Sequence, residues 1–504
     1  MTFYSMLGLV VVVAVSTICY QVHDPFRQLV GKAGGFSAKA ICAGVFLSKR
    51  EIDGSLQDSE LSSIPPILIT NNINHKKQEV SAFFFSEELS AWLGLPVAVA
   101  RYLGPHLGCQ LQIGGFRSED LKPFTVSDES SGSGDLSADE RLVKRSRCVQ
   151  HALTADFTPE GAAANQTRAA VVVHHGVIVG ERYQESLGFR RDTRQLGWSM
   201  TKTVHVAILG AAVQARLVSL DDPVALKDIA PEERQRLELL NGGPLTFRTL
   251  VQMGDVLQME ENYGMFGDVV QMIYAFPDAG KFASQQRTRP LKMNKRSRMA
   301  RLRAQGLSEE PESGTFGWYY SSGVSNVLAR ELRDRFTSLQ AYLAFPRTLY
   351  SAIGADSFAM EVDAAGTFIA SSFSYATPRD WARLGELFLN RGRWGDAQII
   401  PADFVDFVVA AREGSGGLYG GQLWLNPANV TVEQFTAVAQ GPEQQRKHWM
   451  TQTLPQDAYL MSGYLGQYNV IIPSLDVVIT RLGFTEEGAG WDAQRFFGSI
   501  LDCL

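Results

Sequence analysis

The two residues of this sequence best suited to nucleophilic chemistry are Ser199 and Lys202, which stand three positions apart in Ser-Met-Thr-Lys. They open a stretch, residues 198–218, whose alanines and leucines recur at intervals of three and four, which predicts a helix. On one helix face the lysine amine can reach the serine hydroxyl, and a neutral amine can accept its proton. Burial favours the neutral amine, and the helix N-terminus favours negative charge beside it. A helix-capping serine with an exposed lysine is the alternative, and the spacing alone does not exclude it.

A tyrosine and a serine suited to proton transfer follow much later in the chain. Tyr320 and Ser322 stand in Tyr-Ser-Ser-Gly, just before a predicted helix at residues 324–336. A tyrosine at a turn before a helix can relay protons between nucleophile, base and leaving group. Taken alone, this segment favours an aromatic core residue.

The third element is residues 462–468, Ser-Gly-Tyr-Leu-Gly-Gln-Tyr, at the start of a predicted antiparallel hairpin with strands at 467–472 and 475–482. Its glycines let the backbone approach a ligand closely, and an edge strand can present an N–H group to a developing oxyanion. On its own the segment is an ordinary β-turn.

In this order, the three elements resemble the signature motifs of the serine β-lactamase, penicillin-binding protein and DD-peptidase superfamily. The segments GWSMTKT, YYSSGVSNVL and SGYLGQYNVIIPSLDVVITRLG are most similar to the class C-like branch, which includes 6-aminohexanoate-dimer hydrolase and related esterases and amidases. The resemblance covers about residues 165–504. It implies an α+β fold in which helices flank an antiparallel sheet, with a helical subdomain and a small N-terminal unit before it.

The same resemblance implies a role for each residue of the site. Ser199 is expected to be the acylated nucleophile, Lys202 the general base and Tyr320 the phenol that relays protons. The oxyanion hole is expected to combine the N–H groups of Ser199 and Gln467. The other substrate-binding positions are expected at Ser322, Glu261, Tyr263, Tyr464 and Gly466. This chemistry requires no metal and no organic cofactor.

The third element departs from the β-lactamase pattern. True β-lactamases carry Lys-Thr-Gly or a close equivalent there, whose cation engages the substrate carboxylate, whereas this chain has Tyr464-Leu465-Gly466. The loss of that cation argues against β-lactams and D-Ala-D-Ala peptides. It favours an uncharged ester or amide, either a small molecule or a peptide-like one. Two other interpretations stay open: a catalytically inactive binding or scaffold protein of this fold, and a protein that acts through anchoring or polymer binding outside the motifs.

The composition around the motifs predicts how the chain is divided. An uncharged apolar run at residues 6–20 is typical of a signal peptide or a membrane anchor. A stretch rich in Ser, Gly and acidic residues at 127–139 is typical of a solvated linker. The expected parts are the signal peptide or anchor, a small N-terminal domain, the linker, the hydrolase domain and a basic insertion within that domain, at residues 1–22, 23–117, 118–150, 151–504 and 285–313, respectively.

The bulk composition limits the partners and the location. The formal net charge of −6 and the hydrophobic fraction of 45% are typical of a globular protein with no overall attraction for nucleic acid. The basic insertion is either a solvated surface or a contact for an anionic lipid, a polyanion or an acidic partner. The apolar N-terminal run predicts a secreted or membrane-anchored protein. Among five cysteines, Cys42 and Cys109 would tie the N-terminal domain together, but the sequence does not determine the pairing.

Overall fold

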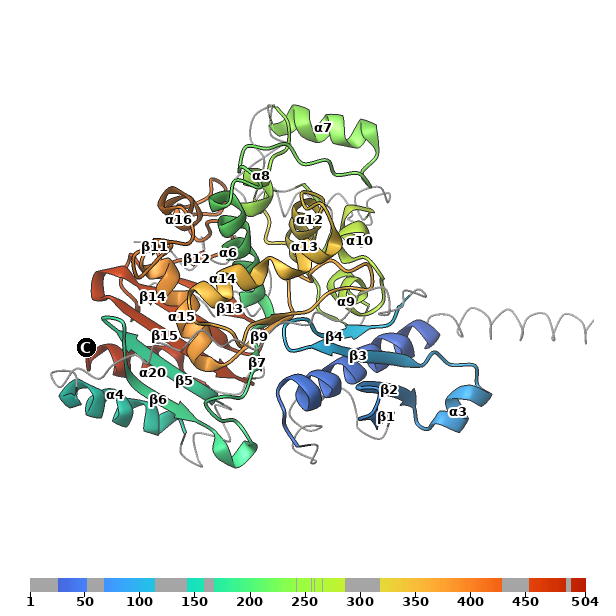
Figure 1. Ribbon diagram of the computed structural model, residues 1–504, viewed down its shortest axis with the longest axis horizontal. Helices are drawn as coiled ribbons and strands as arrows, with labels where there is room; N and C mark the ends of the chain where they lie inside the picture. Colours follow the sequence, from blue (N-terminus) through green and yellow to red (C-terminus); the bar gives the residue numbers. More distant parts are fainter. Residues whose placement is uncertain are drawn as a thin grey trace, which may run out of the picture.

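Helices and antiparallel sheets make up the chain in the computed structural model shown in Figure 1. The predicted leader 1–22, residues 118–142 of the predicted linker and residues 286–313 of the basic insertion lie outside the described residues. Residues 143–150, which the sequence assigned to the linker, form the first turns of helix α4 (Val143–Asp156). The structure describes residues 26–51, 68–113, 143–157, 167–241, 243–254, 256–257, 259–264, 266–285, 318–427, 453–485 and 491–504.

The larger part of the protein is built on a six-stranded antiparallel sheet with the strand order β12-β13-β14-β15-β5-β6. The central strands β5, β14 and β15 are rich in Val and Ile and buried along almost their whole length, as is typical of a sheet covered on both faces. The hairpins β13–β14 and β14–β15 confirm the strands predicted after residue 460. The six strands are β5 (Thr167–His174), β6 (Val177–Tyr183), β12 (Trp424–Leu425), β13 (Tyr459–Gly463), β14 (Gln467–Ile472) and β15 (Val477–Gly483).

Helices cover both faces of this sheet. Gly180 in β6 lies against Val149 of α4, and Gly385 in α15 (Pro378–Leu389) lies against Val478 of β15. The register of β6, β5 and β15 puts these two contacts on opposite faces, because successive strand residues point to opposite sides. The expected fold class, α+β with helices flanking an antiparallel sheet, is confirmed.

The ends of this part of the chain lie together. Helix α20 (Ala493–Leu501) packs against α4, and the disulfide Cys148–Cys503 joins the two segments. Strand β15, near the C-terminus, pairs with β5, near the start of the predicted hydrolase domain. These contacts hold the first and last segments of this part of the chain against each other.

A group of helices beside the sheet matches the expected helical subdomain (Figure 1). Helix α6 (Thr201–Gln214) is buried on all sides from Thr201 to Ala212, as its run of Val, Ala, Ile and Leu predicts. The other helices are α7 (Pro231–Asn241), α8 (Phe247–Val251), α9 (Asp268–Tyr274), α10 (Ala279–Gln285), α12 (Ser322–Arg333), α13 (Leu339–Ala344), α14 (Pro346–Ala352) and α16 (Ala402–Val409). A two-stranded hairpin, β10 (Arg393–Trp394) and β11 (Ala397–Gln398), precedes α16.

A small sheet aligns the residues before α6 with a second segment of the chain. Strand β7 (Gln195–Leu196) pairs with β9 (Ser374–Ala376), and β9 pairs with β8 (Ala359–Met360). The Gly197 N–H extends this pairing by donating to the Ser374 carbonyl oxygen at 2.9 Å. The start of α6 therefore lies beside residues 371–374.

The N-terminal unit is a helix packed on a four-stranded antiparallel sheet. The helix Phe26–Leu47 ends in a π-helical turn, Ala43–Leu47, and the disulfide Cys42–Cys109 joins it to the sheet. Within the described residues it is the one helix long and apolar enough to cross a membrane, yet 61% of its most apolar window is buried inside the protein. The rest of the unit consists of β1 (Ile69–Asn74), β2 (Glu79–Phe84), α3 (Glu87–Trp92), β3 (Ala98–Gly104) and β4 (Gly108–Leu111).

A buried ion pair, Lys39–Glu361, joins the N-terminal unit to the rest of the protein. Lys39 Nζ lies 2.5 Å from Glu361 Oε2, and both side chains are almost fully buried. Lys39 also donates to the Cys109 carbonyl oxygen at 2.7 Å, and the Cys109 N–H donates to Glu361 Oε1 at 2.6 Å. Burial lowers the pKa of Lys39 and raises the pKa of Glu361, while the attraction between the two charges opposes both shifts. Separating the two side chains would leave a buried charge without its partner. The ion pair therefore favours a fixed contact between the N-terminal unit and the rest of the protein.

We expect Lys39→Met to lower the free energy of unfolding by about 3–5 kcal/mol, because the Glu361 carboxylate loses its buried cation. The double variant Lys39→Met/Glu361→Gln should recover part of this loss. Denaturant unfolding followed by circular dichroism measures both values. The matched control is Lys227→Met, which breaks the exposed pair with Asp334 and should cost less than about 1 kcal/mol. Equal losses in the two lysine variants would contradict this account of the interface.

Candidate active site

Ser199 stands in a sharp turn at the start of α6, the 3-10 segment η5 (Trp198–Met200). Trp198 has a left-handed backbone with φ of 48°, a conformation that costs a non-glycine residue about 1–2 kcal/mol. Gly197 has no room for a side chain, because a Cβ atom there would lie 2.3 Å from the Trp381 ring. This turn leaves Ser199 partly exposed at the wall of a cavity.

Lys202 is buried at the first turn of α6, and three oxygen atoms surround its side-chain nitrogen. Nζ lies 3.1 Å from Ser199 Oγ, 3.1 Å from Ser322 Oγ and 3.1 Å from the Ser371 carbonyl oxygen. The residue is 1% exposed, and Nζ lies 4.9 Å from the centre of the Tyr320 ring. The structure thus brings together the first two sequence elements, as predicted, and adds a third partner that has no motif.

A carboxylate lies behind Ser322. The N–H and the hydroxyl of Ser322 donate to Glu261 Oε2 and Oε1 at 2.7 and 2.5 Å. The Tyr263 hydroxyl donates to Oε1 at 2.6 Å, and the Glu261 N–H donates to Tyr319 Oη at 3.2 Å. Because the Ser322 hydroxyl hydrogen is directed to Glu261, its oxygen lone pairs are available to accept from Lys202. A chain of polar contacts therefore runs from Glu261 through Ser322 to Lys202.

Tyr320 is buried among aromatic rings and is 5% exposed. Its ring meets Tyr419 edge-on, with centroids 5.7 Å apart, and lies tilted against Trp424 at 5.6 Å. The ring face borders the Lys202 side-chain nitrogen, where it can stabilise a positive charge. A role of the Tyr320 phenol in proton relay stays a prediction.

The third sequence element contacts the nucleophile turn through Gly463, the last residue of β13. A Cβ atom on Gly463 would lie 2.1 Å from the Gly197 carbonyl oxygen, so the two backbones touch. Tyr464 follows in the hairpin turn. Its ring stacks on Tyr263, with centroids 6.0 Å apart and 7° between the planes, and meets Trp198 edge-on at 5.7 Å. Both tyrosines lie at the cavity wall.

Gln467 and Gly466 make contacts that shape the hairpin itself. Gln467 lies opposite Gly463 in the ladder and is 3% exposed. Gly466 has φ of 82°, and its carbonyl oxygen accepts from Arg481 at 2.7 Å. The Gln467 amide donates to three carbonyl oxygens of the hairpin region, those of Tyr464, Leu465 and Gly483. A direct role of either residue in substrate binding stays a prediction.

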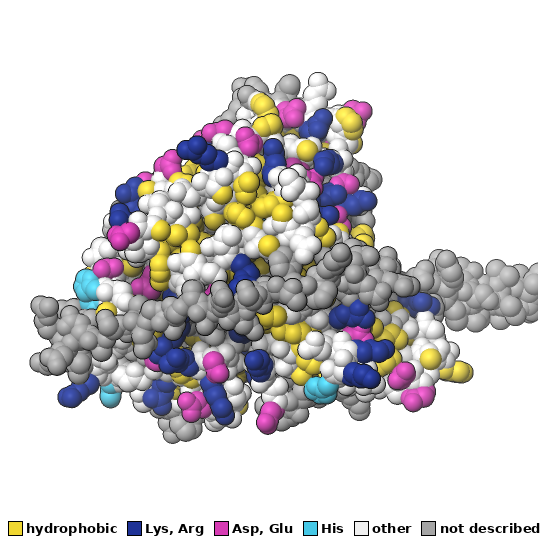
Figure 2. All heavy atoms as spheres, viewed as in Figure 1, with side chains coloured by type: hydrophobic (Ala, Val, Ile, Leu, Met, Phe, Trp, Pro, Cys, Tyr) yellow, Lys and Arg dark blue, Asp and Glu magenta, His cyan; other side chains and the backbone are white. Residues whose placement is uncertain are grey.

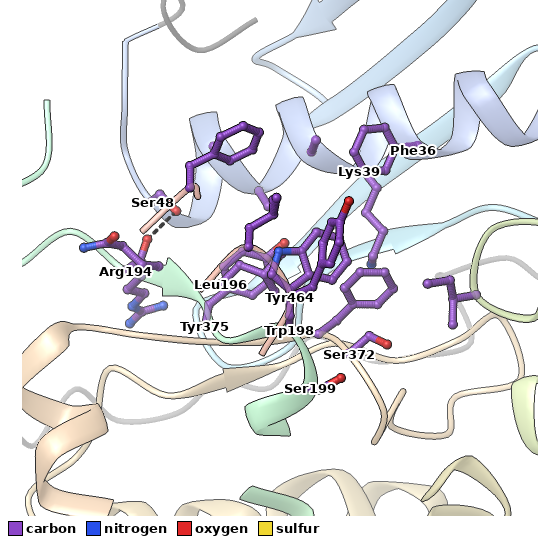
Figure 3. Close-up of a pocket in the computed structure, with 18 of the residues that line it drawn as sticks. Phe36, Lys39, Ser48, Arg194, Leu196, Trp198, Ser199, Ser372, Tyr375 and Tyr464 are labelled. Atoms are coloured by element: carbon purple, nitrogen blue, oxygen red, sulfur yellow. Dashed lines mark hydrogen bonds between the residues drawn. The ribbon is translucent and has the colours of Figure 1, made fainter. Parts of the chain in front are cut away.

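A cavity of about 610 Å³ opens over Ser199, and the N-terminal helix forms its roof (Figure 3). Phe36 and Lys39 of this helix lie on the opposite side of the cavity from Ser199, with the rings of Trp198 and Tyr464 between them. Within the described residues, no group of three or more His, Cys, Asp or Glu side chains is arranged to hold a metal ion. The cavity lining combines aromatic rings with hydroxyl and basic side chains.

Two contributions to the site have no motif in the sequence. Ser371 acts through its carbonyl oxygen, a group that every residue carries. The N-terminal helix lines the cavity although the sequence elements all lie after residue 165. The sequence did contain one indication of this contact. Lys39 is a single cation in the long apolar stretch 33–47, and a buried cation requires an acidic partner elsewhere in the chain.

Comparisons with known proteins give structural likenesses. No family model and no curated protein matches the chain. Among solved structures, it is similar to a protein from Bacillus anthracis assigned as a 6-aminohexanoate-dimer hydrolase, with a TM-score of 0.45 and 20% identity over 68% of this chain and 80% of that one. It is also similar to a penicillin-binding protein homologue from Caulobacter crescentus (TM-score 0.45, 15% identity, 74% of this chain and 99% of that one). A class C β-lactamase from Rhodobacter sphaeroides has a TM-score of 0.43 and 15% identity over 71% of this chain and 98% of its own.

His205 lies one turn beyond Lys202 in α6 and is fully buried. Within the described residues, neither of its ring nitrogens has a hydrogen-bond partner. Burial lowers the pKa of His205 to about 3. An unfolded histidine binds a proton below about pH 6.5, whereas the folded one stays neutral, so the contribution of His205 to stability falls as the pH drops from about 6.5 towards 3.

We expect His205→Leu to remove this dependence on pH. Below about pH 6, the stability of the variant relative to wild type should rise by up to about 1.4 kcal/mol for each pH unit of acidification. Denaturant unfolding of both proteins between about pH 4.5 and 7.5 measures the difference. A difference that stays constant over this range would mean that folded His205 takes up its proton normally.

Proposed function

We propose that the protein is a serine hydrolase that cleaves an amide or ester bond through an acyl intermediate on Ser199. The observation that carries this proposal is the contact between the buried Lys202 Nζ and Ser199 Oγ at the wall of the cavity. A helix-capping serine with a solvent-exposed lysine does not fit, because Lys202 is 1% exposed. A buried amine next to an accessible hydroxyl is the arrangement that activation of serine requires.

The partners of Lys202 suit a general base. A neutral amine has two hydrogens and one lone pair. The Ser322 hydroxyl oxygen and the Ser371 carbonyl oxygen accept the two N–H groups, which directs the lone pair to Ser199. Ser199 then donates its hydrogen to Nζ over the same 3.1 Å contact. The geometry of the base is fixed before substrate binds.

The reaction proceeds in two steps. In the first, Ser199 Oγ bonds to the substrate carbonyl carbon and its proton passes to Lys202. Tyr320 relays that proton to the leaving nitrogen or oxygen as its bond to the carbonyl carbon breaks. In the second, water attacks the acyl ester, its proton returns by the same route, and the carboxylic acid leaves a restored Ser199.

We propose the N–H groups of Ser199 and Tyr464 as the oxyanion hole. Backbone groups of alternate strand residues point to the same side. The Ala458 carbonyl oxygen accepts from the Asn426 N–H on the β12 side of β13. By this alternation the Tyr464 N–H points to that side as well, beyond the end of β12, whereas Gln467 faces β13 across the ladder. Tyr464 therefore suits the role better than Gln467, the donor inferred from the sequence.

We propose an extracytoplasmic location, secreted or membrane-anchored. Two disulfides, Cys42–Cys109 and Cys148–Cys503, support an oxidising compartment. The apolar run at residues 6–20 supports export or anchoring.

A fluorophosphonate probe tests the proposed nucleophile. Wild type should be labelled, Ser199→Ala should not, and Lys202→Met should be labelled about 100-fold more slowly, since the general base is lost. The matched control is Ser372→Ala, which removes a second serine from the cavity wall and should be labelled as fast as wild type. A folded wild type that stays unlabelled, or labelling that persists in Ser199→Ala, would refute the proposal and favour an inactive scaffold.

The chain of contacts behind Lys202 gives a second prediction. Ser322→Ala and Glu261→Gln should each lower kcat for a 4-nitrophenyl ester by about 10-fold with little change in KM, because the amine loses the acceptor that orients it. The two changes act on one chain, so the double variant should lose little more than either single variant. The pH dependence of kcat should shift in both single variants.

The control for these variants is Ser321→Ala, which removes the neighbouring helix cap of α12. This change should lower stability and leave kcat and its pH dependence unchanged. Additive losses in the double variant, or an equal loss in Ser321→Ala, would be inconsistent with the chain from Glu261 to Lys202.

A further inference from the structure

The cavity over Ser199 runs beneath the N-terminal helix (Figure 3). One face of this helix lines the cavity from Lys32 to Gly44, a stretch of about 18 Å at the rise of an α-helix. The cavity volume of about 610 Å³ is in the range of pockets that hold a small organic molecule, about 300–1,000 Å³. The cavity therefore has room for much more of a substrate than the bond that Ser199 would cleave.

The side of the cavity next to Ser199 is lined by aromatic rings in unbroken contact, and we call them the aromatic wall. The centroids of successive rings lie between 5.5 and 6.0 Å apart, as is usual for packed aromatic pairs. In order of contact, the rings are those of Phe36, Tyr274, Phe373, Trp198, Tyr464 and Tyr263. They come from segments far apart in the sequence, so the fold as a whole builds the wall.

Two rings of the aromatic wall keep a large exposed area. Tyr263 and Tyr464 are each 42% exposed, and their stacked rings both line the cavity. Exposed apolar surface beside a candidate nucleophile is typical of a ligand-binding groove. An apolar group of a bound substrate would cover these rings and remove them from water, which is favourable in proportion to the area covered.

The basic side chains of the lining have partners within the protein. Lys39 pairs with Glu361, and Arg194 donates to the Pro105 carbonyl oxygen. The other basic residues of the lining, which also contact neighbouring groups, are Lys32, Arg50 and Arg168. On the face of the molecule shown in Figure 2, Lys and Arg side chains are interspersed with Asp and Glu over the described surface. The lining therefore does not require an anionic substrate.

The N-terminal helix closes the cavity opposite Ser199 with small side chains. Ala40, Ala43 and Gly44 line the cavity about one and two turns beyond Phe36, because helix residues three or four apart share a face. Ala40 is partly exposed, so its methyl group borders the open space of the cavity. A larger side chain at position 40 would occupy part of that space.

We infer that the substrate of the proposed acyl transfer carries a large apolar group next to the scissile bond, held between the aromatic wall and the N-terminal helix, and that Ala40 limits the size of this group. The inference rests on the proposed function, because it takes Ser199 as the point of cleavage. The same lining would hold an apolar group on the acyl side of the bond or on the side of the leaving group. The N-terminal unit, which precedes all three sequence elements, thereby takes part in selecting the substrate.

Two series of esters, used below the concentrations at which they form micelles, test the inference. The first series varies the acyl chain of 4-nitrophenyl esters from acetate to octanoate, and the second varies the alcohol of acetate esters from ethyl to octyl. In at least one series, kcat/KM of wild type should rise about 2-fold to 4-fold for each added methylene group, mainly through KM. The series with the steeper rise identifies the side of the bond on which the apolar group lies.

Variants at position 40 test the part played by the helix. In Ala40→Phe, the ratio of kcat/KM for the longest ester to that for the shortest should fall at least about 10-fold in the same series, because the new ring occupies the space of the chain. Ala40→Leu should give a smaller fall, and it keeps the test decisive if Ala40→Phe does not fold. The matched control is Gln28→Phe, which adds the same ring at an exposed position of this helix outside the cavity lining and should keep the wild-type ratio.

The fluorophosphonate probe separates failure of this inference from failure of the proposed function. The inference alone would be overturned if kcat/KM did not depend on chain length in either series, or if the wild-type ratio persisted in an Ala40→Phe protein that is still labelled at Ser199. Wild type that is labelled at Ser199 but hydrolyses no ester of either series would also overturn it. Absence of both hydrolysis and labelling would overturn the proposed function itself.

Discussion

The site depends on a constraint that follows from burying one amine, that of Lys202. A buried ammonium or amine must have its hydrogens accepted, and Lys202 has three oxygen partners from three separate segments: Ser199, Ser322 and Ser371. Satisfying this one group brings together the start of α6, the start of α12 and the loop before β9. The small sheet β7-β9-β8 and the sharp turn at Trp198 hold these segments within hydrogen-bonding distance of the Lys202 amine. Loss of one partner would change the direction of the lone pair as well as the stability of the protein.

The N-terminal unit is also connected to Lys202 and its oxygen partners, through Glu361 and Phe373. Glu361, which holds Lys39, also donates its N–H to the Phe373 carbonyl oxygen at 2.9 Å, and Lys39 Nζ lies 4.3 Å from the centre of the Phe373 ring. Phe373 lies two residues after Ser371, whose carbonyl oxygen accepts from Lys202. The ion pair that fixes the N-terminal unit therefore also supports the loop whose Ser371 carbonyl oxygen contacts Lys202, the proposed base. A unit that sequence analysis treated as separate is structurally continuous with the site.

The sequence predicted those parts of the site that depend on local geometry. The spacing of Ser199 and Lys202 determines their contact once the helix forms, and the hairpin strands after residue 460 follow from two strand-like segments rich in Val and Ile on either side of the Pro473-Ser474 turn. It did not predict the Ser371 carbonyl oxygen, because a backbone acceptor leaves no trace in residue type. It also assigned residues 143–150 to a linker, because three basic residues follow the polar stretch 127–139 there and the domain boundary was placed near residue 150, although they form a helix that packs on the sheet. The cavity roof was missed for a different reason, because contacts between a helix at residues 26–47 and a serine at 199 are set by tertiary packing.

The burial of α6 on all sides also determines the charge next to Lys202. Lys202 and His205 are three residues apart, so their side chains share a helix face at a spacing of about 5–6 Å. A protonated His205 would add a second positive charge beside Lys202 and hold a proton in competition with the proposed base. Full burial holds the pKa of His205 near 3, so the imidazole is neutral throughout the pH range in which the proposed hydrolase would work. The same burial that leaves two unsatisfied ring nitrogens within the described residues keeps His205 uncharged beside Lys202. Ser199 and Lys202 therefore lie at the first turn of α6 with no charged histidine beside them.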